Sequence, residues 1–201
     1  MNEIKTLRDI AGASNCKVNW ESVAVIFIDY QNEYVHGALP LGEAGEKALF
    51  NAQKILDRAR HLSVPIFHVL HKGSSSSPVF NCDSELSDVV SCMAPISSEK
   101  VIHKTLPSSF YNTELESALK RSGCTQILVA GFMSHMCVMA TTISALERGY
   151  EVIVCEDACA SRSLPDQQGS TIDERSVHTV SMAALGDRYA SIQSTRSIIT
   201  S

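Results

Sequence analysis

Short runs of consecutive apolar residues alternate along the chain with stretches in which apolar residues recur at helical spacing. The clearest runs are 23–28 (VAVIFI), 65–70 (PIFHVL), 127–130 (ILVA) and 152–155 (VIVC). Strands that are apolar throughout, without alternation, are typical of a sheet buried on both faces. Two weaker runs, 101–103 and 189–193, complete a set of six predicted strands.

Four segments between these runs have the spacing of amphipathic helices: 44–62, 113–122, 136–148 and 171–185. Thr113 and Glu116 have the spacing of a capping box at the start of the second. The alternation of strands and helices predicts an α/β fold with a mostly parallel six-stranded sheet. Right-handed crossovers then put helices on both faces, in a doubly wound, Rossmann-like arrangement.

Two segments interrupt this rhythm. Residues 1–20 precede the first strand, and we interpret them as an N-terminal extension that packs on a partner, which leaves 21–201 as a single domain. Residues 72–98 contain a run of four serines and two prolines and predict a loop with some local structure. This loop is a candidate lid.

Composition narrows the possible partners. The chain has 201 residues, of which 44% are hydrophobic and 19% charged, and this suits one compact domain. The net charge of −5 and the absence of a basic run argue against nucleic acid or an anionic membrane as the main partner. No apolar stretch approaches the roughly 18 residues of a transmembrane helix, and the polar first 20 residues have no signal-peptide core. We therefore expect a cytoplasmic protein.

The seven cysteines are odd in number and include no CxxC pair, which argues for free thiols and against a structural zinc site. Three residues whose side chains can take part in catalysis follow predicted strands: Asp29, Lys104 and Cys137. Each alone has a structural explanation, as a turn residue, a solvated lysine and a buried thiol. Together they complete a mechanism, because a thiolate nucleophile needs a cation to stabilise it and a carboxylate to take its proton.

The segments around these residues resemble the isochorismatase-like cysteine hydrolases, a family that includes nicotinamidases and N-carbamoylsarcosine amidase. The resemblance lies in 25–34 (VIFIDYQNEY), 104–119 (KTLPSSFYNTELESAL) and 130–161 (AGFMSHMCVMATTISALERGYEVIVCEDACAS) and extends over about residues 22–195. The third segment is the most specific, since its Gly, CV, GY and DA keep the family spacing.

The resemblance implies a role for each residue. Cys137 would attack a carbonyl carbon and form a thioester, and Asp29 would take the thiol proton and hand it to the leaving amine. Lys104 would lower the pKa of the thiol, whereas Asp29 opposes this, so that either the lysine outweighs the carboxylate or the three groups share a proton. The backbone N–H groups of Met133 and Cys137 would form the oxyanion hole, with a cis peptide at Phe132–Met133.

Further residues are assigned to the site with less specific roles. Gln31, in the family's D-x-Q pattern, would steady the site, and Phe132 would support it. Phe110 could wall the pocket, although a core position explains it equally well. The Asp-x-His motif of nicotinamidases is absent, and His68 fits a packed strand residue better than a ligand. We therefore expect neither a metal nor another cofactor.

The leading hypothesis is a cofactor-free cysteine hydrolase that cleaves a C–N amide-type bond of a small molecule through a thioester at Cys137. One alternative is an isochorismatase that cleaves a vinyl ether, although such enzymes of the family usually lack the cysteine. A second alternative is a non-catalytic scaffold that keeps the fold. A homo-oligomer is expected by analogy with the family.

Overall fold

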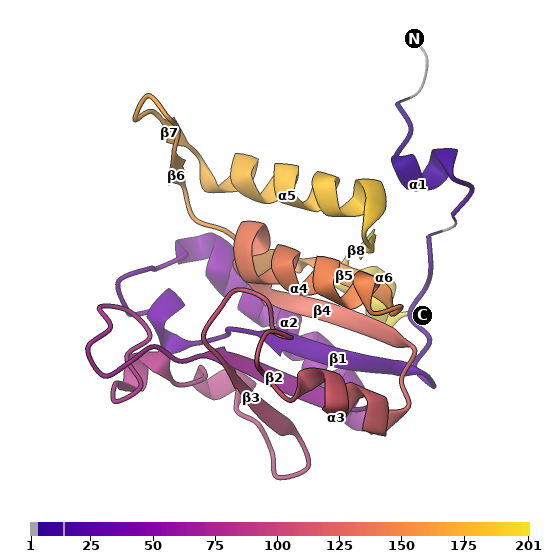
Figure 1. Cartoon of the computed structure of the whole chain (residues 1–201), viewed down its shortest axis with the longest axis horizontal. Helices are drawn as coiled ribbons and strands as arrows, with labels where there is room; N and C mark the ends of the chain where they lie inside the picture. The colour runs from indigo at the N-terminus through magenta and orange to yellow at the C-terminus, as the bar shows by residue number, and fades with distance from the viewer. Residues whose placement is uncertain (1–3, 14) are drawn as a thin grey trace.

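The protein is built around one parallel sheet. The computed structural model describes residues 4–13 and 15–201. The strands, in the spatial order β3-β2-β1-β4-β5-β8, are all parallel to their neighbours (Figure 1). They are β1 (Val23–Ile28), β2 (Ile66–His71), β3 (Lys100–Lys104), β4 (Gln126–Phe132), β5 (Glu151–Ala160) and β8 (Ser191–Gln193). The predicted doubly wound, Rossmann-like α/β fold is confirmed.

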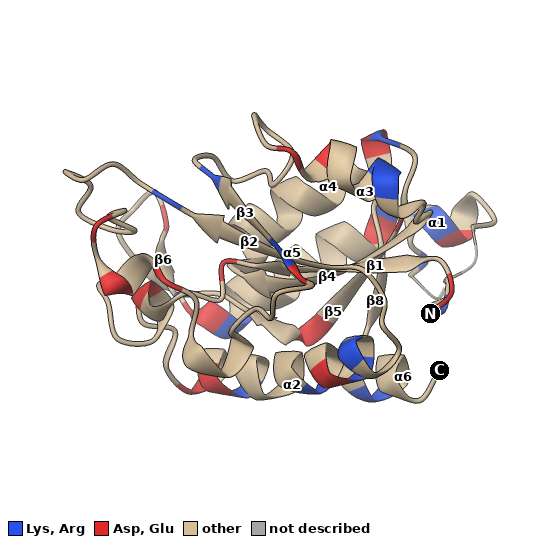
Figure 2. Ribbon diagram, turned by 90° about the horizontal axis from the view of Figure 1, so that it is seen from below, with Lys and Arg blue, Asp and Glu red and all other residues tan. Residues whose placement is uncertain are grey.

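Helices cover both faces of this sheet. In the edge-on view, α2 (Gly42–His61) and α6 (Thr195–Ile199) lie on one side, and α3 (Leu115–Ser122) and α4 (Met139–Glu147) lie on the other (Figure 2). Helix α5 (Glu174–Arg188) packs beside α4, and a two-stranded hairpin, β6 (Leu164–Pro165) and β7 (Thr171–Ile172), precedes it. Short 3-10 turns occur at Asn32–Tyr34, Glu85–Ser87 and Ser91–Met93, and a π-helical turn occurs at Ser134–Val138.

The central position of β1, between two layers of core side chains, explains why this strand is apolar at every position. Val23, Val25 and Phe27 belong to the core beneath α2, whereas the alternate residues of the strand belong to the core beneath α3, α4 and α5. All six side chains are buried. Full burial of an aliphatic or aromatic side chain contributes roughly 1.5–3 kcal/mol, so this central strand is strongly fixed in its register.

All four predicted helix starts differ from the observed ones by two or three residues, and for two of them the side-chain contacts give the reason. Helix α3 begins at Leu115, and no capping box forms because the Thr113 hydroxyl bonds instead to the carbonyl of Ser109 and the amide of Leu115. The last long helix begins at Glu174 rather than at residue 171, because the side chain of Asp173 caps its first turn. Residues 171–172 form β7 instead.

Part of the N-terminal extension packs on its own chain. The short helix α1 (Leu7–Ile10) contacts α5, and the Leu7 amide donates to the Asp187 carboxylate at 2.8 Å. The Cys16 amide donates to the Ser191 hydroxyl at 3.0 Å. Residues 1–3 and 14 of the extension lie outside the described residues. The division at residue 20, the packing on a partner and the expected homo-oligomer stay predictions.

All seven cysteines are free, as expected from their number and spacing. Among the helices within residues 4–13 and 15–201, none is both long enough and apolar enough to cross a bilayer.

The first prediction concerns Gly131 in β4. At this residue the backbone lies so close to Ile28 of β1 that a side chain does not fit. Gly131 has a φ of +151°, and a Cβ there would lie 2.2 Å from the Ile28 carbonyl oxygen. We expect Gly131→Ala to lower the free energy of unfolding by about 3 kcal/mol, as measured by urea denaturation.

Gly149→Ala is the matched control. Its φ of +85° is also positive, but no atom lies within 4 Å of the added Cβ, so we expect a loss of only about 1 kcal/mol. Equal losses in the two variants would show that the close approach at Ile28 is unimportant for stability.

Candidate active site

The three candidate catalytic residues stand at the carboxyl edge of the sheet. Asp29 directly follows β1, Lys104 is the last residue of β3, and Cys137 lies in the π-helical turn that follows β4. Parallel strands bring their carboxyl ends to one edge, where doubly wound proteins bind ligands. The topology therefore brings together side chains that are up to 108 positions apart in sequence.

Lys104 contacts both of the other residues. Its Nζ lies 2.7 Å from Oδ2 of Asp29 and 3.2 Å from Sγ of Cys137. The exposed fractions of Asp29, Lys104 and Cys137 are 0%, 1% and 4%. Oδ1 of Asp29 accepts no hydrogen bond from a described residue, so this carboxylate keeps acceptor capacity next to the thiol.

The backbone holds Asp29 in an unusual conformation. Its φ is +54°, a left-handed value that aspartate tolerates better than most residues. The Asp29 amide donates to the Val69 carbonyl at 2.8 Å, and its carbonyl accepts from the Gln31 amide at 2.8 Å. These bonds fix the carboxylate at the end of β1, where it faces the ammonium group of Lys104.

Burial and the neighbouring charges together set the pKa values of Cys137 and Lys104. Burial raises the pKa of the Cys137 thiol, the Asp29 carboxylate raises it further, and Lys104 only partly offsets them, so that the pKa is about 12. Burial opposes the charge of Lys104, but Asp29 and Cys137 outweigh it and raise the pKa of the ammonium. At neutral pH the lysine is charged and the cysteine is a thiol. Lys104 therefore does not offset the combined effect of burial and Asp29 on the thiol pKa, and the sharing of a proton among the three groups stays a prediction.

The π-helical turn shapes the backbone around the thiol. The carbonyl of Met133 accepts from the amides of Met136 and Val138 at 3.0 and 3.3 Å, but within the described residues it accepts no bond from the Cys137 amide. The peptide bond between Phe132 and Met133 is cis, as the family resemblance implies. Of the two predicted oxyanion donors, the amide of Met133 directly precedes this turn and the amide of Cys137 lies within it.

The π-helical turn Ser134–Val138, which contains Cys137 and is called the nucleophile turn below, is connected to neighbouring elements through two histidines. The hydroxyl of Ser134 lies 2.7 Å from Nδ1 of His178 in α5, and Nδ1 of His135 lies 3.0 Å from the hydroxyl of Ser161 after β5. Burial lowers the pKa of both rings, and the charge of Arg162 lowers that of His135 further. These histidines connect the nucleophile turn to α5 and to the residue that follows β5.

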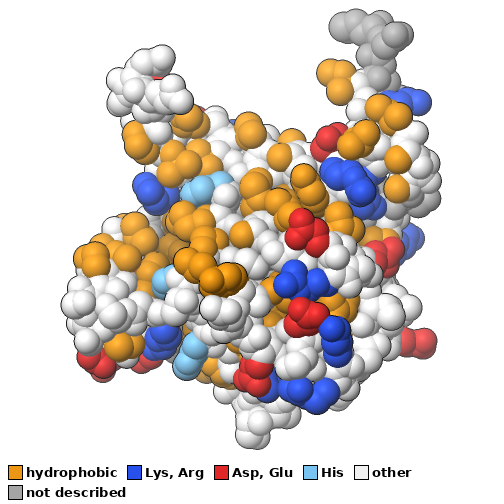
Figure 3. Space-filling view, in the orientation of Figure 1, with side chains coloured by type: hydrophobic (Ala, Val, Ile, Leu, Met, Phe, Trp, Pro, Cys, Tyr) orange, Lys and Arg blue, Asp and Glu red, His pale blue; other side chains and the backbone are white. Residues whose placement is uncertain are grey.

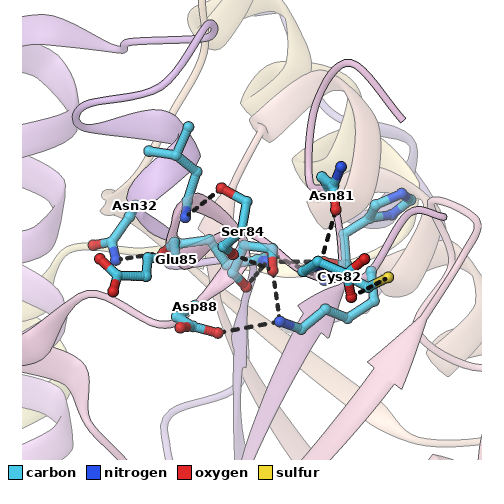
Figure 4. A network of polar contacts seen from close by, with 12 residues as sticks. Asn32, Asn81, Cys82, Ser84, Glu85 and Asp88 are labelled. Carbon is cyan, nitrogen blue, oxygen red and sulfur yellow. Dashed lines mark hydrogen bonds and ion pairs between the residues drawn. The ribbon is translucent and has the colours of Figure 1, made fainter. Parts of the chain in front are cut away.

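Gln31 is fully buried and joins the site to the 72–98 loop. Its Oε1 accepts from the His71 amide at 2.8 Å, and its Nε2 donates to the carbonyls of His71 and Ser87 at 2.8 and 2.6 Å. In Figure 4, Asn32 and Asp88 extend this anchoring: Asn32 donates to the Glu85 carbonyl at 2.9 Å. The predicted steadying role of Gln31 fits this position.

Other parts of the 72–98 loop are also tied to the body of the protein. Lys72 Nζ contacts Ser87 Oγ at 2.6 Å and Asp88 Oδ1 at 3.2 Å (Figure 4). The buried carboxylate of Glu33 accepts from the amides of Phe80 and Ala38 at 3.0 and 2.6 Å. The loop is thus well anchored as a wall beside the site, and its function as a lid stays a prediction.

The two phenylalanines predicted near the site, Phe132 and Phe110, are both buried but belong to different parts of the core. Phe132 is fully buried, and its ring packs edge-on against Tyr30 and Tyr34 at centroid distances of 4.8 and 5.5 Å. Phe110 is buried in the core beneath α3 and α4, with the guanidinium of Arg148 4.6 Å from its ring centroid. Phe110 therefore packs as a core residue, whereas the supporting role of Phe132, which ends β4 just before the turn, stays a prediction.

His68 is a packed strand residue, as predicted. It is buried in β2, and its Nε2 lies 2.9 Å from Oε2 of Glu99. Burial tends to raise the pKa of Glu99, but the hydrogen bonds from Arg60, the Ile96 amide and His68 lower it to about 2. Within residues 4–13 and 15–201, no three His, Cys, Asp or Glu side chains are grouped as metal ligands would be. That the protein needs no metal stays a prediction.

A cavity of about 830 Å³ opens beside the nucleophile turn. Its walls come from residues 38–47, from 159–163 at the end of β5, and from 174–178 at the start of α5. Ser161 and His178 line it and also bond to His135 and Ser134. Cys137 is not among the lining residues, and the turn Ser134–Val138 that contains it is joined to the cavity wall through these two hydrogen bonds.

The fold places the chain among the doubly wound α/β proteins. A family model, the isochorismatase domain, matches residues 23–184. YddQ of Bacillus subtilis, an uncharacterized isochorismatase family protein, is 37% identical over 180 residues, which is 89% of this chain and 99% of YddQ. An isochorismatase structure from Pseudomonas putida KT2440 superposes with a TM-score of 0.92 at 32% identity, covering 98% of this chain and 100% of that one. The chain belongs to the isochorismatase family of hydrolases.

Two further relatives carry names that describe an activity. The secreted isochorismatase effector Isc1 of Verticillium dahliae is 29% identical over 195 residues, which is 97% of this chain and 100% of Isc1. A streptothricin hydrolase of Streptomyces noursei is 30% identical over 145 residues, which is 71% of this chain and 51% of that enzyme. The family thus includes more than one hydrolytic activity.

Sequence reasoning missed several residues around the site. Ser161 is the last residue of the third family segment and Arg162 directly follows it, so their position after a predicted strand was a usable signal. His178 gave no such signal, because only the tertiary packing brings α5 to the turn that contains Cys137.

The coupled charges give a second prediction. Asp29→Asn removes the carboxylate that raises the pKa of the thiol and leaves Lys104 without its counterion, so the Cys137 thiolate becomes the favoured partner of the ammonium. We expect the pKa of Cys137 to fall by more than one unit from about 12. Alkylation by iodoacetamide against pH, followed by peptide mass spectrometry, measures it.

Lys104→Met is the opposite control. It removes the positive charge next to the thiol, which lowers the thiol pKa, so the alkylation profile should shift to higher pH. Profiles that coincide with the wild type in both variants would show that neither group controls the ionisation of Cys137.

Proposed function

We propose that this chain is a cysteine hydrolase that cleaves a C–N amide-type bond of a small molecule through a thioester at Cys137. The observation that carries the proposal is the contact of Lys104 Nζ with Asp29 Oδ2 and Cys137 Sγ in a buried site. A charged lysine is excluded from water here and contacts both a carboxylate and a thiol. A purely structural role gives no reason to bury these three groups together.

Attack begins with a proton transfer, since the resting thiol is protonated. The thiol gives its proton to the Asp29 carboxylate while Sγ attacks the substrate carbonyl carbon. The negative charge moves from Asp29 to sulfur, and Lys104 stays within ion-pair distance of both positions. The ammonium therefore stabilises the charge throughout this step.

The tetrahedral intermediate places its negative charge on the carbonyl oxygen. In this proposal the amides of Met133 and Cys137 donate to that oxygen, as the family resemblance implies. Asp29 then returns its proton to the leaving nitrogen, the C–N bond breaks, and an amine or ammonia departs. The acyl group remains on Cys137 as a thioester.

Hydrolysis of the thioester repeats these roles with water. Asp29 takes a proton from the attacking water, the acid product leaves, and the proton returns to sulfur. Each proton taken by Asp29 is given back, so no cofactor is required by this scheme. The adjacent cavity of about 830 Å³ has the size of a small-molecule site.

The names of two relatives point to different hydrolytic activities. The streptothricin hydrolase named above supports a hydrolase reading, and Isc1 supports vinyl ether cleavage as the second candidate. A vinyl ether is cleaved by protonation and needs no cysteine nucleophile. The buried Cys137, in contact with Lys104, favours the amide reading and also argues against a non-catalytic scaffold.

The third prediction concerns turnover. We expect Cys137→Ala to abolish ammonia release in a screen of small amides, ureides and carbamoyl compounds, because the covalent intermediate cannot form. Cys92→Ala, which changes an exposed thiol, should keep wild-type activity. A Cys137→Ala variant that retains wild-type turnover would refute the covalent mechanism.

The fourth prediction concerns metals. Treatment with EDTA followed by desalting should leave at least about 90% of the activity on the substrate that the screen identifies, because the proposed scheme uses only the thiol, the carboxylate and the ammonium. Loss of activity that added zinc or manganese restores would contradict this.

A further inference from the structure

A buried hydrogen bond ties the nucleophile turn to helix α5. The hydroxyl of Ser134, the first residue of the turn, lies 2.7 Å from Nδ1 of His178. Ser134 is 0% exposed, and within residues 4–13 and 15–201 its hydroxyl has no other partner. A buried hydroxyl that loses its partner costs free energy, because water cannot replace the lost bond. The bond therefore holds the start of the turn at one place on α5.

This bond lies next to both predicted oxyanion donors. Met133, whose amide is one of them, directly precedes Ser134, and Cys137, whose amide is the other, follows three residues later. In a regular helix the Met133 carbonyl would accept from the Cys137 amide, but here the Val138 amide donates to it instead. The directions of the two donor amides thus depend on how this irregular turn is held, and not on a regular helical ladder.

Helix α5 is a firm support for the bond. The side chain of Asp173 caps its first turn, and Met182 and Leu185 bury its inner face in the core. The same core contains Cys137, so the helix and the nucleophile are packed against one set of side chains. Groups on helices are positioned more precisely than groups on loops. His178, between the cap and these core residues, can therefore fix the turn that it contacts.

The two ring nitrogens of His178 have different surroundings. Nδ1 faces the buried hydroxyl of Ser134, whereas Nε2 contacts no polar group of the described residues. His178 lines the cavity of about 830 Å³ and a second cavity of about 430 Å³ bounded by α1 and α5. In the space-filling view, cationic and histidine side chains lie together near the base of the β6–β7 hairpin, among hydrophobic ones (Figure 3). Burial lowers the pKa of the ring, so it is neutral at pH 8.

We propose that His178 is a positioning residue, which acts through Ser134 to hold the nucleophile turn with its donor amides directed at the carbonyl oxygen of the substrate. This inference rests on the proposed function and deepens it. Without the bond the turn shifts, and the amides of Met133 and Cys137 lose their alignment with the oxyanion. Because these donors act only on charge that develops on a carbonyl oxygen, attack of the thiol on a saturated carbon does not depend on them.

Two reactions of the same thiol test the proposal. Iodoacetamide alkylates Cys137 by displacement of iodide from a saturated carbon, and no oxyanion forms. p-Nitrophenyl acetate acylates it: sulfur bonds to the carbonyl carbon, an oxyanion forms, and p-nitrophenolate leaves as the C–O bond breaks. In both reactions Asp29 takes the thiol proton and passes it to water. The burst of p-nitrophenolate at pH 8 gives the acylation rate, and peptide mass spectrometry gives the alkylation rate and locates both products.

The ratio of acylation to alkylation isolates the oxyanion step. We expect it to fall about ten- to hundredfold in His178→Leu, which keeps a side chain of similar size but no hydrogen bond. Ser134→Ala removes the other side of the bond and should lower the ratio as much, and the double variant should lower it no further, because one interaction is lost in each case.

Two variants serve as controls. His178→Asn keeps an amide that can accept or donate close to the place of Nδ1, so at least about half of the wild-type ratio should remain. Thr179→Ala changes the next, exposed residue of α5 and should leave the ratio at the wild-type value.

Several results would overturn the proposal. Equal falls in His178→Leu and His178→Asn would show that only packing matters, and an unchanged ratio in His178→Leu and Ser134→Ala would show that the bond has no effect on the donors. A variant that unfolds is recognised by its alkylation profile, because the pKa of the Cys137 thiol returns from about 12 to the value of about 8.5 of a free cysteine. Ser134→Ala, which removes one oxygen atom, then decides.

The wild-type protein separates this proposal from the proposed function. A Cys137 that iodoacetamide alkylates but the ester does not acylate would refute the thioester mechanism itself. Acylation with a ratio indifferent to His178 and Ser134 would refute only the positioning role.

Steady-state kinetics on the substrate that the ammonia screen identifies give a second readout. In His178→Leu, kcat should fall about tenfold or more while KM changes less than about twofold, because oxyanion donors act on the transition state and not on the bound substrate. A rise in KM with unchanged kcat would contradict the positioning role.

Discussion

The buried ion pair between Lys104 and Asp29 is the constraint on which the rest of the site depends. Moving an ammonium and a carboxylate out of water costs several kcal/mol for each group, and only a close, well-held pair offsets it. The Asp29 amide donates to the Val69 carbonyl in β2, and Lys104 ends β3, the edge strand that pairs with β2. The rigid carboxyl edge of a parallel sheet provides the fixed positions that such a pair requires.

The same pair sets the electrostatics of the thiol. With its charge already balanced by Asp29, Lys104 does not ionise Cys137, and burial raises the pKa of the thiol to about 12. The site stores a neutral nucleophile beside a carboxylate that can accept its proton. In the proposed mechanism the negative charge changes place between two neighbours of one ammonium, so no charge has to be created in the buried site.

Irregular segments around the site are fixed by buried polar side chains rather than by regular secondary structure. Gln31 ties the 72–98 loop to the end of β2, and Glu33 ties Phe80 and Ala38 together. A side-chain hydrogen bond likewise joins Ser134 of the nucleophile turn to His178 in α5. Satisfied buried polar groups specify one arrangement, because each alternative leaves a donor or acceptor unpaired.

The sequence by itself determined the strand and helix pattern and the positions of Asp29, Lys104 and Cys137 after strands, because apolar runs and helical spacing are local signals. It did not determine the hairpin before α5 or helix α6, since both are short and lack periodicity. Only the tertiary structure decided the pKa of Cys137 and the place of Arg162 in a cavity wall. Both depend on distances between groups that are remote in sequence, and burial sets the strength of their interaction.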